Sequence, residues 1–101
     1  MPDWVRVASV AEVPPGSVQE VHTQGRVVAL FNVEGDFFAV DGICPHQGGP
    51  LGDGELEGST VTCPWHGWQF NVRDGKNLLN SQIEQEAFQV RVDDGEVFLY
   101  V

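Results

Sequence analysis

Short stretches in which apolar and polar residues alternate are the main periodicity of this chain. A two-residue period over a few residues is typical of half-buried β-strands. No stretch keeps a helical period for three turns, and only residues 81–88 are expected to carry a helical turn. The strands predicted from the pattern are 4–7, 18–21, 26–33, 36–40, 60–62, 69–72, 89–92 and 97–100.

Two tight turns join predicted strands into hairpins. Glu34-Gly35 separates 26–33 from 36–40, and Asp93-Asp94-Gly95 precedes the last strand. Acidic residues followed by glycine are typical of such turns because they tolerate a positive φ angle. Many short strands joined by turns, with no long helix, predict an all-β fold of the antiparallel sandwich or barrel type.

Two segments interrupt this rhythm of strands. Residues 41–58 are rich in glycine and proline, and a loop of this length in a compact domain is usually functional. The first segment contains Cys44 and His46, and the second, 63–68, contains Cys63 and His66. We therefore expect the chemistry of the protein to lie on these two loops.

Length and charge exclude several classes of function. The 101 residues suffice for one small domain, and 15 acidic against 5 basic residues give a net charge of -10. Such a surface repels phosphate backbones, so we expect no nucleic acid and favour basic protein partners. The longest apolar run, 27–31, is too short for a membrane span, and the N-terminus resembles no targeting signal. A cytoplasmic location is therefore expected.

The two cysteines are expected to bind a metal or to be redox-active, because stable disulfides are rare in the cytosol. Each cysteine has a histidine close behind it, in Cys44-Pro45-His46 and in Cys63-Pro64-Trp65-His66, and sixteen residues separate the two groups. Two loops that each offer a thiolate and an imidazole can close around a metal centre. The third histidine, His22, stands alone.

The ligand types alone leave alternatives open. A structural Cys₂His₂ zinc site uses the same four donors, although its usual spacing includes paired ligands of one kind and a following helix. A pair of buried cysteines with incidental histidines is a second alternative. The parallel Cys-Pro openings of the two groups favour a shared metal centre over this second reading.

The pattern Cys-x-His, sixteen residues, Cys-x-x-His resembles the Rieske iron–sulfur motif, in which two histidines replace two cysteines on one iron of a [2Fe–2S] cluster. The flanking residues 44–51 and 63–70 agree with it. The resemblance implies that Cys44 and Cys63 bind one iron and that His46 and His66 bind the other. It also implies a single Rieske domain over 1–101, with a cluster-binding subdomain at about 42–70 inserted into a β base formed by 1–41 and 71–101.

Replacing two anionic thiolates by neutral imidazoles raises the reduction potential of such a cluster. This chain departs from the high-potential members of the family, which carry a disulfide between the two loops. Gly49 and Trp65 occupy those positions here, and Trp68 and Phe70 replace a serine and a tyrosine whose hydroxyls donate to the sulfurs. A potential near the low end of the Rieske range is therefore expected.

Glycines 48, 49 and 67 are expected to let backbone N–H groups approach the sulfurs, with ordinary turn chemistry as the alternative. Pro50 is expected to cover a third side of the cluster, as a similarly placed proline loop does in the family.

The chain offers no second metal site and no nucleotide-binding glycine motif, so it is not expected to be an enzyme or to bind a small-molecule substrate. It resembles the ferredoxin components of aromatic-ring-hydroxylating dioxygenase systems. This implies a soluble one-electron carrier between a flavin-dependent reductase and a terminal oxygenase. The alternatives are a small subunit of a larger oxidoreductase, such as assimilatory nitrite reductase, or a redox-sensing module. Asp53, Glu55 and Glu57 are candidates for a docking rim, or for a merely solvated loop.

Overall fold

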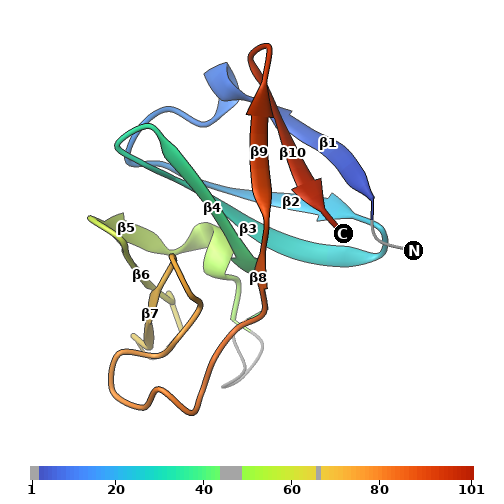
Figure 1. Ribbon diagram of the computed structural model, residues 1–101. Helices are drawn as coiled ribbons and strands as arrows, with labels where there is room; N and C mark the ends of the chain where they lie inside the picture. Colours follow the sequence, from blue (N-terminus) through green and yellow to red (C-terminus); the bar gives the residue numbers. More distant parts are fainter. Residues whose placement is uncertain (1–2, 44–48, 66) are drawn as a thin grey trace.

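The computed structural model describes residues 3–43, 49–65 and 67–101. In these ranges the chain forms three antiparallel sheets (Figure 1). One sheet has the order β1-β10-β9, the second β2-β3-β4-β8 and the third β5-β6-β7. The strands are β1 Trp4–Ser9, β2 Val18–Thr23, β3 Arg26–Val33, β4 Asp36–Asp41, β5 Glu55–Glu57, β6 Thr60–Thr62, β7 Gln69–Asn71, β8 Ala87–Phe88, β9 Val90–Asp93 and β10 Glu96–Tyr100. The predicted all-β fold with antiparallel sheets is confirmed.

The sheet β2-β3-β4-β8 lies between two hydrophobic cores, and β3 contributes to both. Ala29, Phe31 and Val33 face one core, which also contains residues of β6, β7 and the two loops. Val28 and Leu30 face the other core, shared with β1 and β10. Because successive side chains of a strand point to opposite faces, a strand buried on both sides is apolar throughout. This explains the continuous apolar run that the sequence shows at this strand.

Hairpin turns of the predicted kind occur between β3 and β4 and between β9 and β10. Glu34 and Gly35 have φ angles of 53° and 98°, and Asp94 and Gly95 have 51° and 76°. Positive φ at both central residues is typical of the two-residue turns whose twist matches that of the strands. Asn32 supports the first turn, because its buried side chain accepts a hydrogen bond from Gly35 N at 2.7 Å.

The structure corrects one expectation and adds two strands. Residues 81–88 form no helical turn: Glu84 bridges to Lys76, and Ala87–Phe88 is the short strand β8. The glycine-rich segment contains a 3₁₀ helix, η2 (Leu51–Asp53), and the strand β5, which pairs with β6. A second 3₁₀ helix, η1 (Val10–Glu12), follows β1. Both helices of the described ranges are three residues long, and no helix there has the length and apolarity to cross a bilayer.

Candidate cluster site

Cys63 is the one predicted ligand that the structure describes, and it lies directly after β6. Its side chain is 1% exposed and belongs to the core cluster that contains Leu51 and Phe70. Its backbone N donates to the carbonyl of Trp68 at 2.7 Å, which closes the second loop over six residues. The other three predicted ligands, Cys44, His46 and His66, lie outside the described residues.

The sulfur of Cys63 lies against a glycine of the first loop. A Cβ placed on Gly49 would lie 2.7 Å from Cys63 Sγ, closer than any side chain carbon normally approaches. Trp65 N donates toward the same sulfur at 3.4 Å. The end of the first loop, the sulfur of the second loop and a backbone donor therefore meet at one point, as a site shared by two loops requires.

Gly49 and Trp65 themselves are neighbours. The same Cβ on Gly49 would lie 3.1 Å from Trp65 Cβ. These are the two positions at which the high-potential members of the resembled family carry their disulfide, so their closeness agrees with the resemblance. Here the indole of Trp65 takes that place, and it is exposed.

The three glycines expected near the sulfurs differ in their roles. Gly49 is buried against Cys63 Sγ. Gly67 has a φ angle of +71° and open space around it, which supports the alternative of turn chemistry. Gly48 lies outside the described residues. Pro50 forms a bridge with Ile43 at the neck of the first loop and precedes η2, and its expected role as a cover stays a prediction.

Phe70 and Trp68 belong to the packing behind the site. Phe70 is fully buried in the core cluster, and Trp68 packs against this cluster with its ring centroid 6.5 Å from that of Phe70. Neither side chain has a hydroxyl. These two positions therefore offer no hydroxyl donor to the sulfurs. Phe70 packs in the core.

Gln85 is a supporting residue that the sequence analysis missed. Its side chain is 6% exposed, and Nε2 donates to the carbonyls of Asp41, at 2.9 Å, and of Ile43. Its backbone N donates to Gly75 O at 2.7 Å. Gln85 thus ties the stem of the first loop to the segment that follows the second. No local pattern marks it, because the partners of its side chain are more than forty residues away in the sequence.

Replacing Gln85 by leucine is expected to destabilise the holoprotein by about 2 kcal/mol, because the carbonyls of Asp41 and Ile43 lose their donor while the volume is kept. Thermal unfolding followed by circular dichroism measures the effect. The matched control is Gln89→Leu, the same change at an exposed position. Equal melting temperatures for the two variants would show that the buried amide does not support the loop stem.

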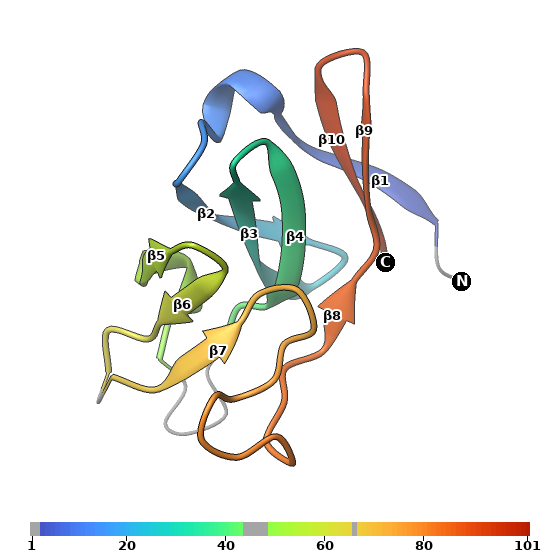
Figure 2. The same ribbon diagram turned by 60° about the vertical axis from the view of Figure 1, so that its left-hand side comes forward.

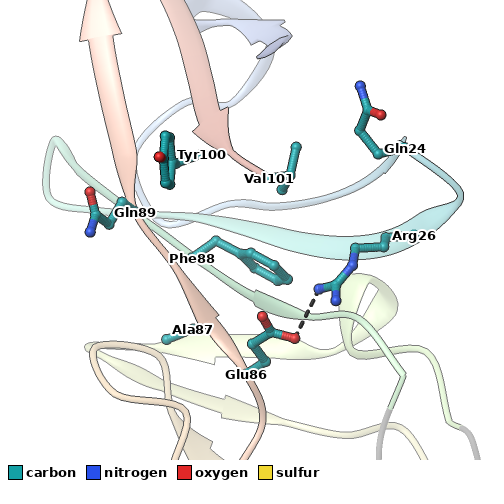
Figure 3. A pocket seen from close by; sticks show the side chains of 8 residues that line it. All are labelled: Gln24, Arg26, Glu86, Ala87, Phe88, Gln89, Tyr100 and Val101. Atoms are coloured by element: carbon teal, nitrogen blue, oxygen red, sulfur yellow. Dashed lines mark hydrogen bonds and ion pairs between the residues drawn. The ribbon is translucent and has the colours of Figure 1, made fainter. Parts of the chain in front are cut away.

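A pocket of about 350 Å³ is lined by residues of β3, β8 and β10 and of the segments next to them (Figure 3). Its charged groups are already used: Arg26 pairs with Glu86 at 2.9 Å and lies over the ring of Phe88. No predicted site residue lines it. We therefore do not assign the chemistry of the protein to this pocket.

The surroundings of Cys63 Sγ fit an iron–sulfur cluster. Within the described residues no three side chains of His, Cys, Asp or Glu gather in a way that could hold a metal, and three of the four predicted ligands lie outside those residues. The space kept free by Gly49 and the N–H of Trp65 both face the sulfur of Cys63. Backbone donors directed at sulfur are a typical second shell of iron–sulfur sites.

Comparison with known proteins gives matches over nearly the whole chain. The ferredoxin component of the naphthalene 1,2-dioxygenase system of Pseudomonas aeruginosa is 37% identical over 97 residues, covering 95% of this chain and 93% of that protein. The ferredoxin component of the naphthalene 1,2-dioxygenase/salicylate 5-hydroxylase systems of a Ralstonia species is 33% identical over 98 residues, covering 96% and 94%.

Solved structures agree with these relatives. The ferredoxin of Sphingomonas yanoikuyae B1 has a TM-score of 0.89 at 30% identity and covers 98% of this chain and 99% of its own. A chain in the complex of reduced oxygenase and oxidised ferredoxin of carbazole 1,9a-dioxygenase has a TM-score of 0.88 at 30% identity, covering 96% of this chain and 92% of that one. Residues 3–92 match the family described as the Rieske [2Fe-2S] domain. Since this match spans most of the chain and agrees with the sequence motif and the fold, the protein belongs to the Rieske [2Fe–2S] domain family.

Proposed function

We propose that this chain is a one-electron carrier that takes electrons from a flavin-dependent reductase and delivers them to a terminal oxygenase. The observation that carries the proposal is the similarity, over nearly the full length of both chains, to ferredoxin components of dioxygenase systems. The carbazole 1,9a-dioxygenase complex, in which ferredoxin and oxygenase occur together, supports the second partner. In this role the chain is a component of an oxidoreductase system rather than a catalyst.

The proposed ligands are Cys44 and Cys63 for one iron and His46 and His66 for the other. When bound, the cluster supplies reversible uptake of one electron. The buried position of Cys63 supports its part in this set, because packing among core side chains holds its sulfur in one place. The N–H of Trp65 stabilises negative charge on that sulfur, which favours the reduced state.

We propose residues of about 42–70 as the cluster-binding subdomain, inserted into a single domain that spans the chain. The separate sheet β5-β6-β7, which runs from Glu55 to Asn71, supports this division. The core cluster between this sheet and β3 supports a rigid attachment to the β base. We also propose a cytoplasmic location, where a flavin-dependent reductase has access to reduced nicotinamide.

The reduction potential is expected near the low end of the Rieske range of about -150 to +300 mV, because Trp68 and Phe70 bring no hydroxyl donors to the sulfurs. A redox titration followed by visible absorption measures it. Phe70→Tyr, which adds one hydroxyl, is expected to raise the midpoint, with Phe38→Tyr at the edge of the same core as the control. A clearly positive midpoint for the unmodified protein would contradict the expectation.

Reconstitution tests the function. The purified holoprotein is mixed with candidate flavin-dependent reductases and reduced nicotinamide, and then with candidate terminal oxygenases, while bleaching and recovery of the visible bands are followed. The proposal expects catalytic reduction by a reductase and rapid reoxidation by an oxygenase. Stoichiometric copurification with a larger oxidoreductase, together with no reoxidation by any oxygenase, would instead identify a permanent subunit.

A further inference from the structure

The two longest segments of this chain without a formal charge are 42–52 and 58–72, and the shorter segment 77–83 also has none. In the whole chain, about one residue in five is Asp, Glu, Lys or Arg. The first two segments contain the two cluster loops. The third is connected to the second, because Asn77 bridges to Phe70 and Leu78 N donates to Gln69 O at 3.0 Å. In Figures 1 and 2 the third segment and β7 lie at the end of the molecule away from the β9–β10 turn.

Large apolar side chains are exposed on these same segments. In the described part of the chain six are exposed, and four of them are Ile43, Trp65, Leu78 and Leu79. Leu79 is 98% exposed, the highest value of the group. An uncharged surface with several exposed apolar side chains is typical of a contact surface, whereas single exposed apolar residues need no explanation.

The backbone around Leu79 is held in place by its neighbours. The side chain of Asn77 is buried, and its Oδ1 accepts hydrogen bonds from the backbone N of Leu79, at 2.9 Å, and of Asn80, at 3.1 Å. Asn77 N donates to Ile83 O at 2.9 Å, which closes the segment 77–83. Leu79 is therefore presented to solvent by an ordered turn, so that a partner would not have to order this segment on binding.

A groove of about 350 Å³ lies between this turn and the second cluster loop. Gly67 and Trp68 line one side, and Leu79, Asn80 and Ile83 line the other. Gly67 also lines a second depression, together with Asp53 and Glu55. The uncharged groove thus has acidic side chains next to it, and this arrangement fits a partner with an apolar centre and basic residues beside it.

We propose that the terminal oxygenase docks on this groove, with Leu79 entering an apolar socket of the oxygenase and basic residues of the oxygenase facing Asp53 and Glu55. This docking surface rests on the proposed function. It specifies the surface chemistry of the terminal oxygenase, which is the second partner in that function. The buried apolar contact is expected to set the lifetime of the complex, while the acidic residues set the association rate and its dependence on salt.

Stopped-flow electron transfer tests the assignment. Dithionite-reduced holoprotein is mixed with a terminal oxygenase that the unmodified chain reduces, at increasing oxygenase concentration. Leu79→Asn is expected to raise the half-saturating concentration about tenfold or more at every salt concentration. The control Val92→Asn, at an exposed apolar residue of β9, is expected to have no effect. Asp53→Asn with Glu55→Gln is expected to slow association at low salt only.

The outcomes separate the two proposals. An unchanged visible spectrum and an unchanged midpoint potential show that the cluster of Leu79→Asn is intact. With both unchanged, a half-saturating concentration equal to that of Val92→Asn overturns the docking surface, as does an effect confined to the reductase step. If the unmodified protein reduces no terminal oxygenase but keeps its cluster and potential, the proposed function itself fails.

Discussion

Replacing His66 with alanine is expected to abolish the visible absorption of the iron–sulfur cluster, and replacing His46 is expected to do the same. An imidazole that binds iron directly cannot be replaced by a methyl group. Loss of an outer-shell partner alone typically costs about 10–100-fold in metal affinity, so losing a ligand costs at least as much. Iron and acid-labile sulfide assays, with visible spectra of the purified variants, measure the effect.

His22 provides a matched control on the same chain. It lies on β2 with an exposed side chain, and its Nε2 is 3.0 Å from Glu20 Oε2. His22→Ala is therefore expected to leave iron content and spectrum unchanged. If His46→Ala or His66→Ala also kept the full visible spectrum, the proposed ligand set would be wrong.

Replacing Gly49 with alanine is expected to accelerate loss of iron to a chelator about tenfold, because its methyl group would overlap Cys63 Sγ at 2.7 Å. The sulfur is buried among core side chains and cannot move aside without disturbing them. Overpacking of this kind costs about 1–3 kcal/mol, and about 1.4 kcal/mol corresponds to tenfold. The decay of visible absorption in excess chelator gives the rate.

Gly67→Ala is the control for a change of the same size in the other loop. Its Cβ would meet open space, although its φ angle of +71° makes the backbone strained. We expect a loss of stability of about 1–2 kcal/mol from this strain, with an iron release rate close to that of the unmodified protein. A faster release from Gly67→Ala than from Gly49→Ala would contradict the contact with sulfur as the cause.

Much of the fold could be predicted from local patterns. The strand Arg26–Val33 was predicted with its observed bounds because it is rich in Val, Leu and Phe, and its hairpin because Glu34-Gly35 suits positive φ angles. Strand β5 was missed, since three residues, Glu-Leu-Glu, are too few to establish a period. Strand β8 has two residues and exists through its pairing with β4, which no local pattern encodes.

The family was predictable from the sequence, whereas the residues that support Cys63 and the first loop were not. The spacing of cysteine and histidine residues carried the family resemblance, which the comparisons confirm. The contact of Gly49 with Cys63, and the hydrogen bonds from Gln85 to the stem of the first loop, join residues far apart in the sequence. Such contacts depend on how the sheets pack, so composition and spacing do not indicate them.

Two nitrogen ligands and two sulfur ligands are proposed to hold one binuclear iron centre. Pulsed electron paramagnetic resonance of the dithionite-reduced protein, prepared with and without ¹⁵N-histidine, tests this proposal most directly. The proposed ligand set predicts a reduced-cluster signal with strong couplings to two nitrogens, both changed by the histidine label. A signal whose nitrogen couplings are unchanged by the histidine label, or a colourless protein that contains zinc, would contradict this ligand set.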